Sequence, residues 1–394
     1  MFVNKQTFKF LILTRCRNFT FYDAVILIGS TKPLKVTNMA SQLFSPLIIK
    51  SITLKNRIAI SPMCQYSAVD GFANDWHLVH LGSRASGGAG LIIQEATAVS
   101  PEARISPADL GIWKEEHIGK LKQITEFISS QNSVPGIQLA HAGRKASVSA
   151  PWLGNKKLNF DQDGWQTVAP SAIPYHDNEP FLPEALDQNG IQKVITDFKT
   201  ATKRAVEAGY KVLEIHAAHG YLLHQFLSPL TNVRTDEYGG SFENRIRFTL
   251  EILEAVQTEW PKDFPLIVRI SATDWADGGW NIEESIKLSK ILKEKGVDLI
   301  DVSSGGLVSH QKIPVGPGYQ VHFAEKVKNE TDILTGAVGL ITEAKQAEEI
   351  LNKEQADLIL FARASLRNPN LPLDFAAALN DDIHWPKQYE RAKL

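Results

Sequence analysis

The densest run of reactive side chains in the sequence is His216-Ala-Ala-His219-Gly-Tyr221. Two imidazoles three residues apart on a turn can point their N–H groups at one oxygen, and a phenol two residues later can supply a proton. A zinc site would require a third ligand, and a metalloprotease pair would lie on a helix beside a glutamate. Because this run instead leaves an apolar segment of strand type, we expect no metal. A purely structural pair of histidines remains the alternative.

Polar side chains also accompany three earlier apolar segments. The first is followed by Ser61-Pro62-Met63-Cys64-Gln65-Tyr66, which brings a thiol and a phenol together, although a free cysteine is commonly a small core residue. Ala96 comes just after the second segment, and Gln138 lies in the third. The amide of Gln138 offers a donor and an acceptor to the edge of a pyrimidine-like ring, but an ordinary hydrogen bond would use it equally well.

The later segments carry features of a phosphate site. Arg269 interrupts an apolar segment, where a guanidinium needs an anion, a polarised carbonyl or a buried carboxylate to offset its lost hydration. The two final segments are followed by Gly336 and Gly339 and by Ala362 and Arg363. Small residues let backbone N–H groups approach a phosphate, and an arginine adds charge-assisted hydrogen bonds. The sequence therefore predicts a phosphorylated cofactor.

The elements that must position these residues alternate between short apolar segments and longer segments of helical period. The expected strands are 57–60, 91–94, 136–139, 212–216, 266–270, 299–302, 333–335 and 358–361. The expected helices are 115–131, 191–208, 242–260, 282–295 and 342–352. Eight such units predict an α/β fold of the closed TIM (β/α)8 barrel type, with working residues at the carboxyl ends of the strands. A dinucleotide-binding open sheet would need its glycine motif after a first strand, whereas Gly87, Gly88 and Gly90 precede one. Gly209 and Gly296 are expected to end two helices.

Two parts of the chain depart from this pattern. Residues 1–38 contain six Lys or Arg side chains and one Asp, so we expect an extension outside the fold, with Met39 as the effective first residue. A transit peptide is the alternative. The barrel fold is then expected to span residues 39–394. Within it, residues 147–186 are rich in proline and too long for a simple connection, which favours a lid or wall of the active site.

The composition excludes several classes of function. The formal net charge is -2, and no long basic run is present to attract nucleic acid or an anionic membrane. The apolar stretches near the N-terminus are too short to span a bilayer. With only two cysteines, Cys16 and Cys64, neither a disulfide scaffold nor a thiolate metal cluster is expected, and the reducing cytoplasm is the expected location.

Four motifs together make this chain closely similar to the old yellow enzyme family. They are Ser61-Pro-Met-Cys64, Gln138-Leu-Ala-His-Ala-Gly-Arg144, His216-Ala-Ala-His219-Gly-Tyr221 and Arg234-Thr-Asp-Glu-Tyr-Gly-Gly-Ser-Phe-Glu-Asn-Arg245. The similarity begins near Phe44 and continues to the C-terminus. Cys64 and Tyr66 resemble the marks of the NADPH dehydrogenase and xenobiotic reductase branch.

This resemblance implies a bound FMN and NADPH as co-substrate, with NADH as the alternative. Hydride would then pass through FMN to the activated C=C bond of a small enone-like or nitro compound. The implied cofactor contacts are Ser61, Pro62, Met63, Cys64, Ala96, Gln138 and Arg269, with the phosphate near Gly336, Gly339, Ala362 and Arg363. Family members often have glycine where this chain has Ala362.

The resemblance also implies roles around the substrate. We expect His216 and His219 to hold charge on the substrate oxygen, Tyr221 to protonate the α-carbon, and Cys64 to tune the flavin. Tyr66 is expected to contact substrate. Arg391 resembles an arginine of this branch that reaches into a neighbouring subunit's active site, which implies a homo-oligomer, either a dimer or a tetramer. Iron–sulfur relatives are excluded by the cysteine count, whereas a flavin-free barrel lyase or a non-catalytic ligand-binding barrel remains an alternative.

Overall fold

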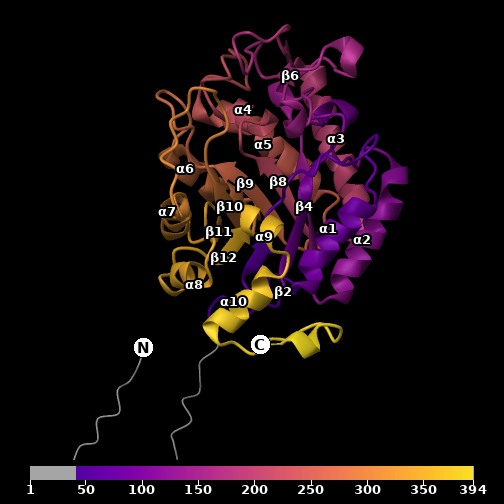
Figure 1. Cartoon of the computed structure of the whole chain (residues 1–394). Helices are drawn as coiled ribbons and strands as arrows, with labels where there is room; N and C mark the ends of the chain where they lie inside the picture. Colours follow the sequence, from indigo (N-terminus) through magenta and orange to yellow (C-terminus); the bar gives the residue numbers. More distant parts are fainter. Residues whose placement is uncertain (1–40, 394) are drawn as a thin grey trace, which may run out of the picture. The chain divides into compact units, whose positions relative to one another are not determined.

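The chain folds around a closed barrel of eight parallel strands, seen in a computed structural model that describes residues 41–393 (Figure 1). The expectation for residues 1–38 lies outside the described residues. Around the barrel the order is β10, β11, β12, β3, β4, β5, β8 and β9. Their bounds are β3 (Ile58–Ile60), β4 (Leu91–Ala98), β5 (Val134–Ala140), β8 (Val212–Ala217), β9 (Leu266–Ser271), β10 (Leu299–Ser303), β11 (Leu334–Ala337) and β12 (Leu358–Phe361). The predicted TIM barrel is confirmed.

Helices cover the outside of the barrel (Figure 1). They are α1 (Asp75–Ser86), α2 (Ile118–Ser130), α3 (Gln188–Glu207), α5 (Phe242–Gln257), α6 (Ile282–Glu294), α7 (Val321–Thr331) and α8 (Ala344–Asn352), with the shorter α4 (Leu222–Leu227), α9 (Arg363–Arg367) and α10 (Leu371–Leu379). Gly209 and Gly296 follow α3 and α6 with φ of +89° and +88°, as predicted for left-handed helix ends.

The sequence did not reveal α1, because the buried face of this helix is mixed. It carries His77, His80 and Arg84 beside Leu81 and Ala85, while Trp76 and Val79 are exposed. The apolar periodicity on which such a prediction depends is therefore weak. The helix is fixed instead by its first turn, where the Asn74 side chain accepts a hydrogen bond from the backbone of Trp76.

One end of the barrel is closed by an antiparallel hairpin, β1 (Leu47–Ile49) and β2 (Ile52–Leu54). Leu47, Ile49 and Leu54 pack into a buried cluster with the first residues of four strands, namely Leu91, Val212, Leu299 and Leu358. These are the amino ends of parallel strands, so the carboxyl ends meet at the opposite, open end. Figure 1 shows β2 and α10 at one end of the barrel and β6 (Val168–Ala169) at the other.

The stretch 147–186 has little regular structure. It contains two short 3-10 helices, Pro151–Leu153 and Phe160–Gln162, and the strand pair β6 with β7 (Glu184–Ala185). Arg144 ties it to the barrel by donating from Nη1 to the carbonyls of Ile173 and Pro174. Among the residues that the structure describes, no helix is long and apolar enough to cross a bilayer.

Candidate active site

The residues singled out in the sequence come together at the carboxyl ends of the strands. Ser61 follows β3, Ala96 lies in β4, Gln138 in β5, His216 in β8 and Arg269 in β9. Strand pairing sets Gln138 beside Glu214, and Arg269 beside both His216 and Asp301. Parallel pairing therefore places side chains that are distant in sequence next to one another at the open end of the barrel.

A buried polar network lies at this end. Arg269 Nε lies 3.0 Å from Asp301 Oδ2, and Arg269 Nη1 donates to Ser61 Oγ at 3.2 Å. Gln138 Nε2 donates to Glu214 Oε1 at 2.6 Å. Both structural alternatives raised by the sequence, a barrel carboxylate for Arg269 and an ordinary hydrogen bond for Gln138, are thus present. Neither excludes a contact with a cofactor, because each side chain keeps further donors or acceptors.

A cavity of about 220 Å³ lies beyond the ends of β11 and β12. It is lined in part by Ser303, Gly339, Ala362, Arg363 and Arg367. Gly339 has φ of +124°, and a Cβ there would lie 2.9 Å from Gln320 Nε2, so only glycine fits without displacement. A wall of close backbone with two guanidiniums nearby suits a phosphate group.

Gly336 occupies a different place from the one the sequence indicated. The expected strand 333–335 extends from Leu334 to Ala337, so Gly336 lies inside β11 and not in the loop after it. A Cβ at Gly336 would come within 2.6 Å of Leu360 Cδ1. The residue permits close packing of β11 against β12 and is absent from the lining of the cavity.

The imidazoles of His216 and His219 lie edge to face, with ring centroids 5.2 Å apart. His219 Nε2 lies 2.7 Å from Ser303 Oγ, and Ser303 also lines the cavity beyond the ends of β11 and β12. His216 Nδ1 is buried and has no partner among the described residues. Burial, together with the charge of Arg269, holds the pKa of both histidines well below the usual value. Each ring is therefore neutral near pH 7 and carries one N–H donor.

Tyr221 completes this cluster, with its ring centroid 5.1 Å from that of His216. It lines a second cavity of about 470 Å³ together with Tyr66, Lys145, Tyr175 and other residues of the 147–186 stretch. Burial raises the pKa of Tyr221 well above its ordinary value, so the phenol keeps its proton at neutral pH. The cavity is large enough for a small organic molecule.

Lys145 was not singled out in the sequence, yet it lies directly beside Tyr221. Its Nζ donates to the carbonyls of His219 and Gly306, both at 2.9 Å, and lies 5.0 Å from the centroid of the Tyr221 ring. Burial lowers the pKa of Lys145 to about 7, and the neighbouring Arg144 acts in the same direction. Groups whose pKa values are strongly shifted towards neutrality are common at functional sites.

Cys64 lies among groups that keep its thiol protonated. Burial raises its pKa well above the usual value, and the nearby Asp109 and Glu95 raise it further. Tyr66, Ala142 and Tyr221 belong to the same small apolar cluster as Cys64. Pro62 and Met63 connect Cys64 to β3, and Met63 packs against the main core. A neutral thiol in this setting is a poor nucleophile.

Three non-glycine residues near these cavities have a left-handed backbone. Tyr66, His219 and Leu340 have φ of +48°, +56° and +51°. Such conformations cost about 1 kcal/mol or more each and persist where the surroundings determine them. His219 is held by a hydrogen bond from its backbone N–H to Ser271 Oγ. Backbone strain at this end of the barrel agrees with a functional role.

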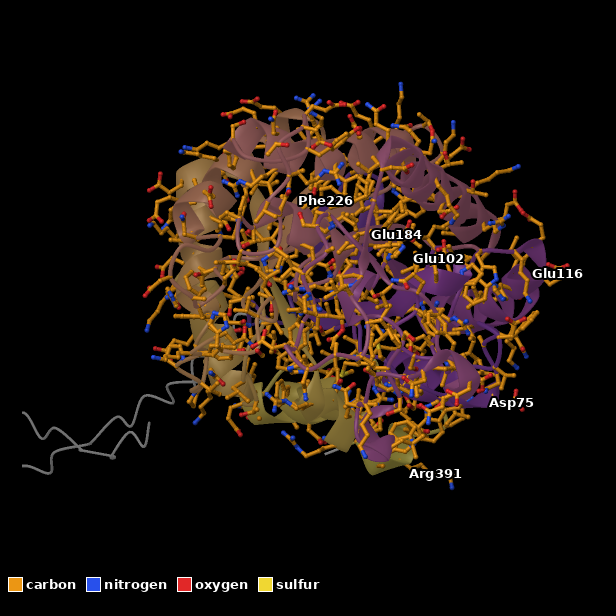
Figure 2. All side chains as sticks on the ribbon, turned by 90° about the horizontal axis from the view of Figure 1, so that it is seen from above. Asp75, Glu102, Glu116, Glu184, Phe226 and Arg391 are labelled. Carbon is orange, nitrogen blue, oxygen red and sulfur yellow. The ribbon has the colours of Figure 1, made fainter. Side chains whose placement is uncertain are left out.

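Arg391 is a predicted residue that a single chain leaves far from this site. It is exposed on a short 3-10 helix, Glu390–Ala392, and Figure 2 shows it at the edge of the molecule, pointing outward. Other members of the site escaped notice in the sequence: Asp109, Lys145, Glu214, Asp301 and Ser303. For Glu214 and Asp301 a signal existed, since each is a carboxylate inside an otherwise apolar strand.

Comparisons with known proteins agree with this architecture. The family described as NADH:flavin oxidoreductase / NADH oxidase matches residues 42–382. An NADPH dehydrogenase of Bacillus velezensis is 51% identical over 356 residues, which are 90% of this chain and 100% of that protein. The solved structure of morphinone reductase is 29% identical with a TM-score of 0.72, over 89% of this chain and 93% of that one. That of the old yellow enzyme homologue from Zymomonas mobilis is 26% identical with a TM-score of 0.71, over 89% and 98%.

These findings confirm the resemblance to old yellow enzymes and the two cofactors that it implied. The cavity beyond β11 and β12, together with the Gln138 amide and the Arg269 guanidinium at the barrel mouth, fits a bound flavin mononucleotide. The chain belongs to the NADH:flavin oxidoreductase / NADH oxidase family and is an FMN-dependent oxidoreductase that takes NADPH or NADH as co-substrate.

Proposed function

We propose that this oxidoreductase reduces the C=C bond of α,β-unsaturated carbonyl compounds and of nitro-activated alkenes. The observation that carries the proposal is that Tyr221, which lines the larger cavity, packs edge to face against the ring of His216. One is a phenol that keeps its proton, and the other is a neutral imidazole. A proton donor in the cavity wall thus lies directly against a neutral imidazole that can donate an N–H to a substrate oxygen.

The chain's residues fit FMN at the mouth of the barrel. When bound, FMN supplies the hydride chemistry, accepting hydride from NADPH and giving hydride to the β-carbon of the acceptor. Residues that would hold its ring system are Ser61, Pro62, Met63, Cys64, Ala96, Gln138 and Arg269, and those near its phosphate are Gly339, Ala362 and Arg363, with Gly336 packed behind them.

The side chains then divide the work on the substrate. His216 and His219 bind the carbonyl oxygen, on which negative charge develops as hydride arrives at the β-carbon. His219 Nε2 lies against Ser303 Oγ. His219 must therefore bind the substrate oxygen through Nδ1, or through Nε2 after giving up its contact with Ser303. Tyr221 gives its proton to the α-carbon, and the Lys145 ammonium next to its ring stabilises the phenolate that remains.

The stretch 147–186 and Tyr66 shape the rest of the cavity. Tyr175 and Pro151 face the same space as Tyr66 and Tyr221. This cover excludes water from the developing enolate and restricts which acceptors can enter. The alternatives are a flavin-free lyase and a non-catalytic ligand-binding barrel. Neither explains this arrangement of hydrogen-bond and proton donors, and neither agrees with the family to which the chain belongs.

The test is a stopped-flow comparison of the two half-reactions in the wild type and in Tyr221→Phe. Flavin reduction by NADPH should be nearly unchanged. Re-oxidation by a cyclohexenone-type acceptor should slow by about 10²-fold, because a general acid is lost. Nitroalkenes should be affected little, since their nitronate products persist and are protonated by water.

Tyr66→Phe is the matched control, because it removes a second phenol from the same cavity. It should leave the protonation step intact. If Tyr221→Phe impairs only the reductive half, or leaves enone reduction unchanged, Tyr221 is not the proton donor. If no alkene of either class yields a saturated product, the proposed acceptor class is wrong.

A further inference from the structure

Four polar side chains fill the barrel just inside its open end. They are Gln138, Glu214, Arg269 and Asp301, one from each of the neighbouring strands β5, β8, β9 and β10. None is more than 5% exposed, and Glu214 and Asp301 are fully buried. A buried charge is stable only when it is paired and hydrogen-bonded. The charges of this cluster must therefore balance within it.

The cluster contains two carboxyl groups and one guanidinium. Glu214 and Asp301 each shift the pKa of the other, because the two carboxyl groups lie close together. Two ionised carboxylates cannot hydrogen-bond to each other, because neither has a hydrogen to donate. Glu214 Oε2 and both carboxyl oxygens of Asp301 are buried atoms without a hydrogen-bond partner among the described residues. One proton held between the two groups gives Glu214 Oε2 and one oxygen of Asp301 a partner.

The other contacts identify which group holds the proton. Asp301 Oδ2 lies 3.0 Å from Arg269 Nε, and this cation favours an ionised Asp301. Glu214 Oε1 already accepts from the Gln138 amide, which leaves Oε2 to carry the hydrogen. Burial and the charge of Asp301 together raise the pKa of Glu214 to about 8, although Arg269 and the hydrogen bond from Gln138 act in the opposite direction. The hydrogen bonds then run from Gln138 to Glu214 and from Glu214 to Asp301.

We propose that Glu214 is a positioning residue that stays protonated, holds the Gln138 amide towards the flavin, and keeps the cluster electrically neutral so that the flavin can accept electrons. When Glu214 carries its proton, the only charges in the cluster are those of Arg269 and Asp301, and these cancel. Without this proton, the cluster would carry one negative charge near the residues that would hold the flavin, and a flavin becomes more negative on reduction. The bond to Glu214 also fixes the amide orientation, so that the Gln138 carbonyl oxygen faces outward as an acceptor.

The groups facing Glu214 can be named on each packed strand. Strand β5 brings the uncharged Gln138, β9 brings Arg269, and β10 brings Asp301. On β8 itself, His216 lies two residues along the strand on the same side. Burial and the charge of Arg269 keep this histidine neutral by lowering its pKa well below the usual value. Arg269 and Asp301 are thus the charges that act on Glu214.

The first measurement is the midpoint potential of the bound flavin between pH 6 and 10, in the wild type and in Glu214→Gln. Glutamine keeps both hydrogen bonds but cannot lose a proton. At pH 7 the two proteins should have similar potentials. Above about pH 8 the wild-type potential should fall more steeply, by about 30 mV per pH unit for one proton per two electrons. The variant should lack this extra slope.

Equal slopes up to pH 10 would overturn the proposal. So would a clear rise in potential for Glu214→Gln at pH 7, because it would mean that glutamine had replaced an ionised carboxylate. No alkene is present in this experiment, so its outcome is independent of the proposed acceptor class.

The second measurement reports the proton directly and also serves if Glu214→Gln binds flavin poorly. Infrared spectra of the wild type at pH 7 should contain the C=O stretch of a protonated carboxyl group that is absent in Glu214→Gln. The same band should disappear in Asp301→Asn, because Arg269 then needs Glu214 as its counter-ion. The proposal fails if wild type and Glu214→Gln have the same band, or if the band survives in Asp301→Asn.

Discussion

At the scale of single residues, Lys145 links the charge of the site to pH. Its ammonium touches the faces of Tyr221 and Tyr175 and donates to the backbone of the His219 loop. Because its pKa is lowered to about 7, it loses its charge as pH rises through neutrality. Arg144, Tyr175 and Tyr221 are the other titratable groups against it, and all three keep their protons in this range.

We therefore expect flavin re-oxidation by enones to slow as pH rises through about 7, by up to about tenfold, since the phenolate of Tyr221 loses a neighbouring cation. Lys145→Met should remove this pH dependence and run at the slow rate throughout. Stopped-flow rates from pH 5.5 to 8.5 test this. A wild-type profile that is flat, or a variant that keeps the descending limb, would assign the titration to another group.

The same lysine should appear in the stability of the protein. Between about pH 7 and 10.5 the unfolded chain binds a proton at Lys145 that the folded chain does not. The free energy of unfolding therefore gains a component that rises with pH across this window. Urea titrations of the wild type and Lys145→Met at several pH values should show this component in the wild type alone.

Cys64 offers a third prediction at this scale. Its raised pKa means that little thiolate exists at pH 7, although the side chain is only partly buried. Alkylation by iodoacetamide should be at least tenfold slower than for a free thiol and should still be rising at pH 9. Cys64→Ala should turn over with an altered flavin potential. Rapid alkylation at neutral pH, or complete inactivity with FMN bound, would contradict a purely modulating role.

The residues that sequence reasoning found and missed differ in a physical way. His216, His219 and Tyr221 lie within six positions, so their proximity is local and legible in the sequence. Glu214 and Asp301 become neighbours only because strands β8, β9 and β10 pair in register. Lys145 reaches the site from a turn after β5, and its nearness to Tyr221 depends on the path of two loops. Contacts of this kind require tertiary structure.

At the scale of elements, strands were easier to predict than helices or loops. Every strand of the barrel is buried on both faces, so each appears as an apolar run whatever its partners are. Helix α7 has no side-chain cap at its start, and α1 buries polar side chains, so the usual signals are weak or absent. The 147–186 stretch was identified by length and proline content, but its two small strands leave no readable pattern.

This stretch is held by one nearly buried ion pair. Lys157 Nζ lies 3.3 Å from Glu179 Oε2, and both side chains are less than 10% exposed. Lys157 also donates to the carbonyls of Arg144 and Ala146, close to the start of the stretch. Glu179 thereby connects the middle of the 147–186 stretch to the rim of the barrel.

Glu179→Gln should loosen this connection by about 1 to 3 kcal/mol, since Lys157 keeps its charge without its partner. Hydrogen exchange should accelerate between residues 151 and 182 and not in the barrel strands, and KM for bulky acceptors should change more than the rate of flavin reduction. The control is Glu349→Gln, which breaks the exposed pair with Lys353 and should change neither. Uniform acceleration in both variants would mean that the pair has no local role.

At the scale of the whole molecule, the C-terminal segment has no evident task within its own chain. In Figure 1 it lies near α10, at the end of the barrel opposite β6 and the active site. Arg391 on this segment is exposed and makes no ion pair with residues 41–393. If it serves catalysis, as proposed from the sequence, it must do so in the site of a neighbouring subunit.

A hybrid of two defective variants tests this arrangement. Tyr221→Phe impairs the site of its own chain, whereas Arg391→Ala should impair the site of its neighbour by weakening substrate or nicotinamide binding. In a co-expressed hybrid dimer, both defects then fall in one site, and the other site has an intact Tyr221 and an intact Arg391. Purified hybrids should recover about half of the wild-type enone turnover per dimer, well above either parent. If Arg391 acted within its own chain, each site of the hybrid would carry one defect, and turnover would only average the two parents.

Sedimentation of the wild type at assay concentration completes the test, because a monomer with full turnover would exclude any contribution from a neighbouring chain.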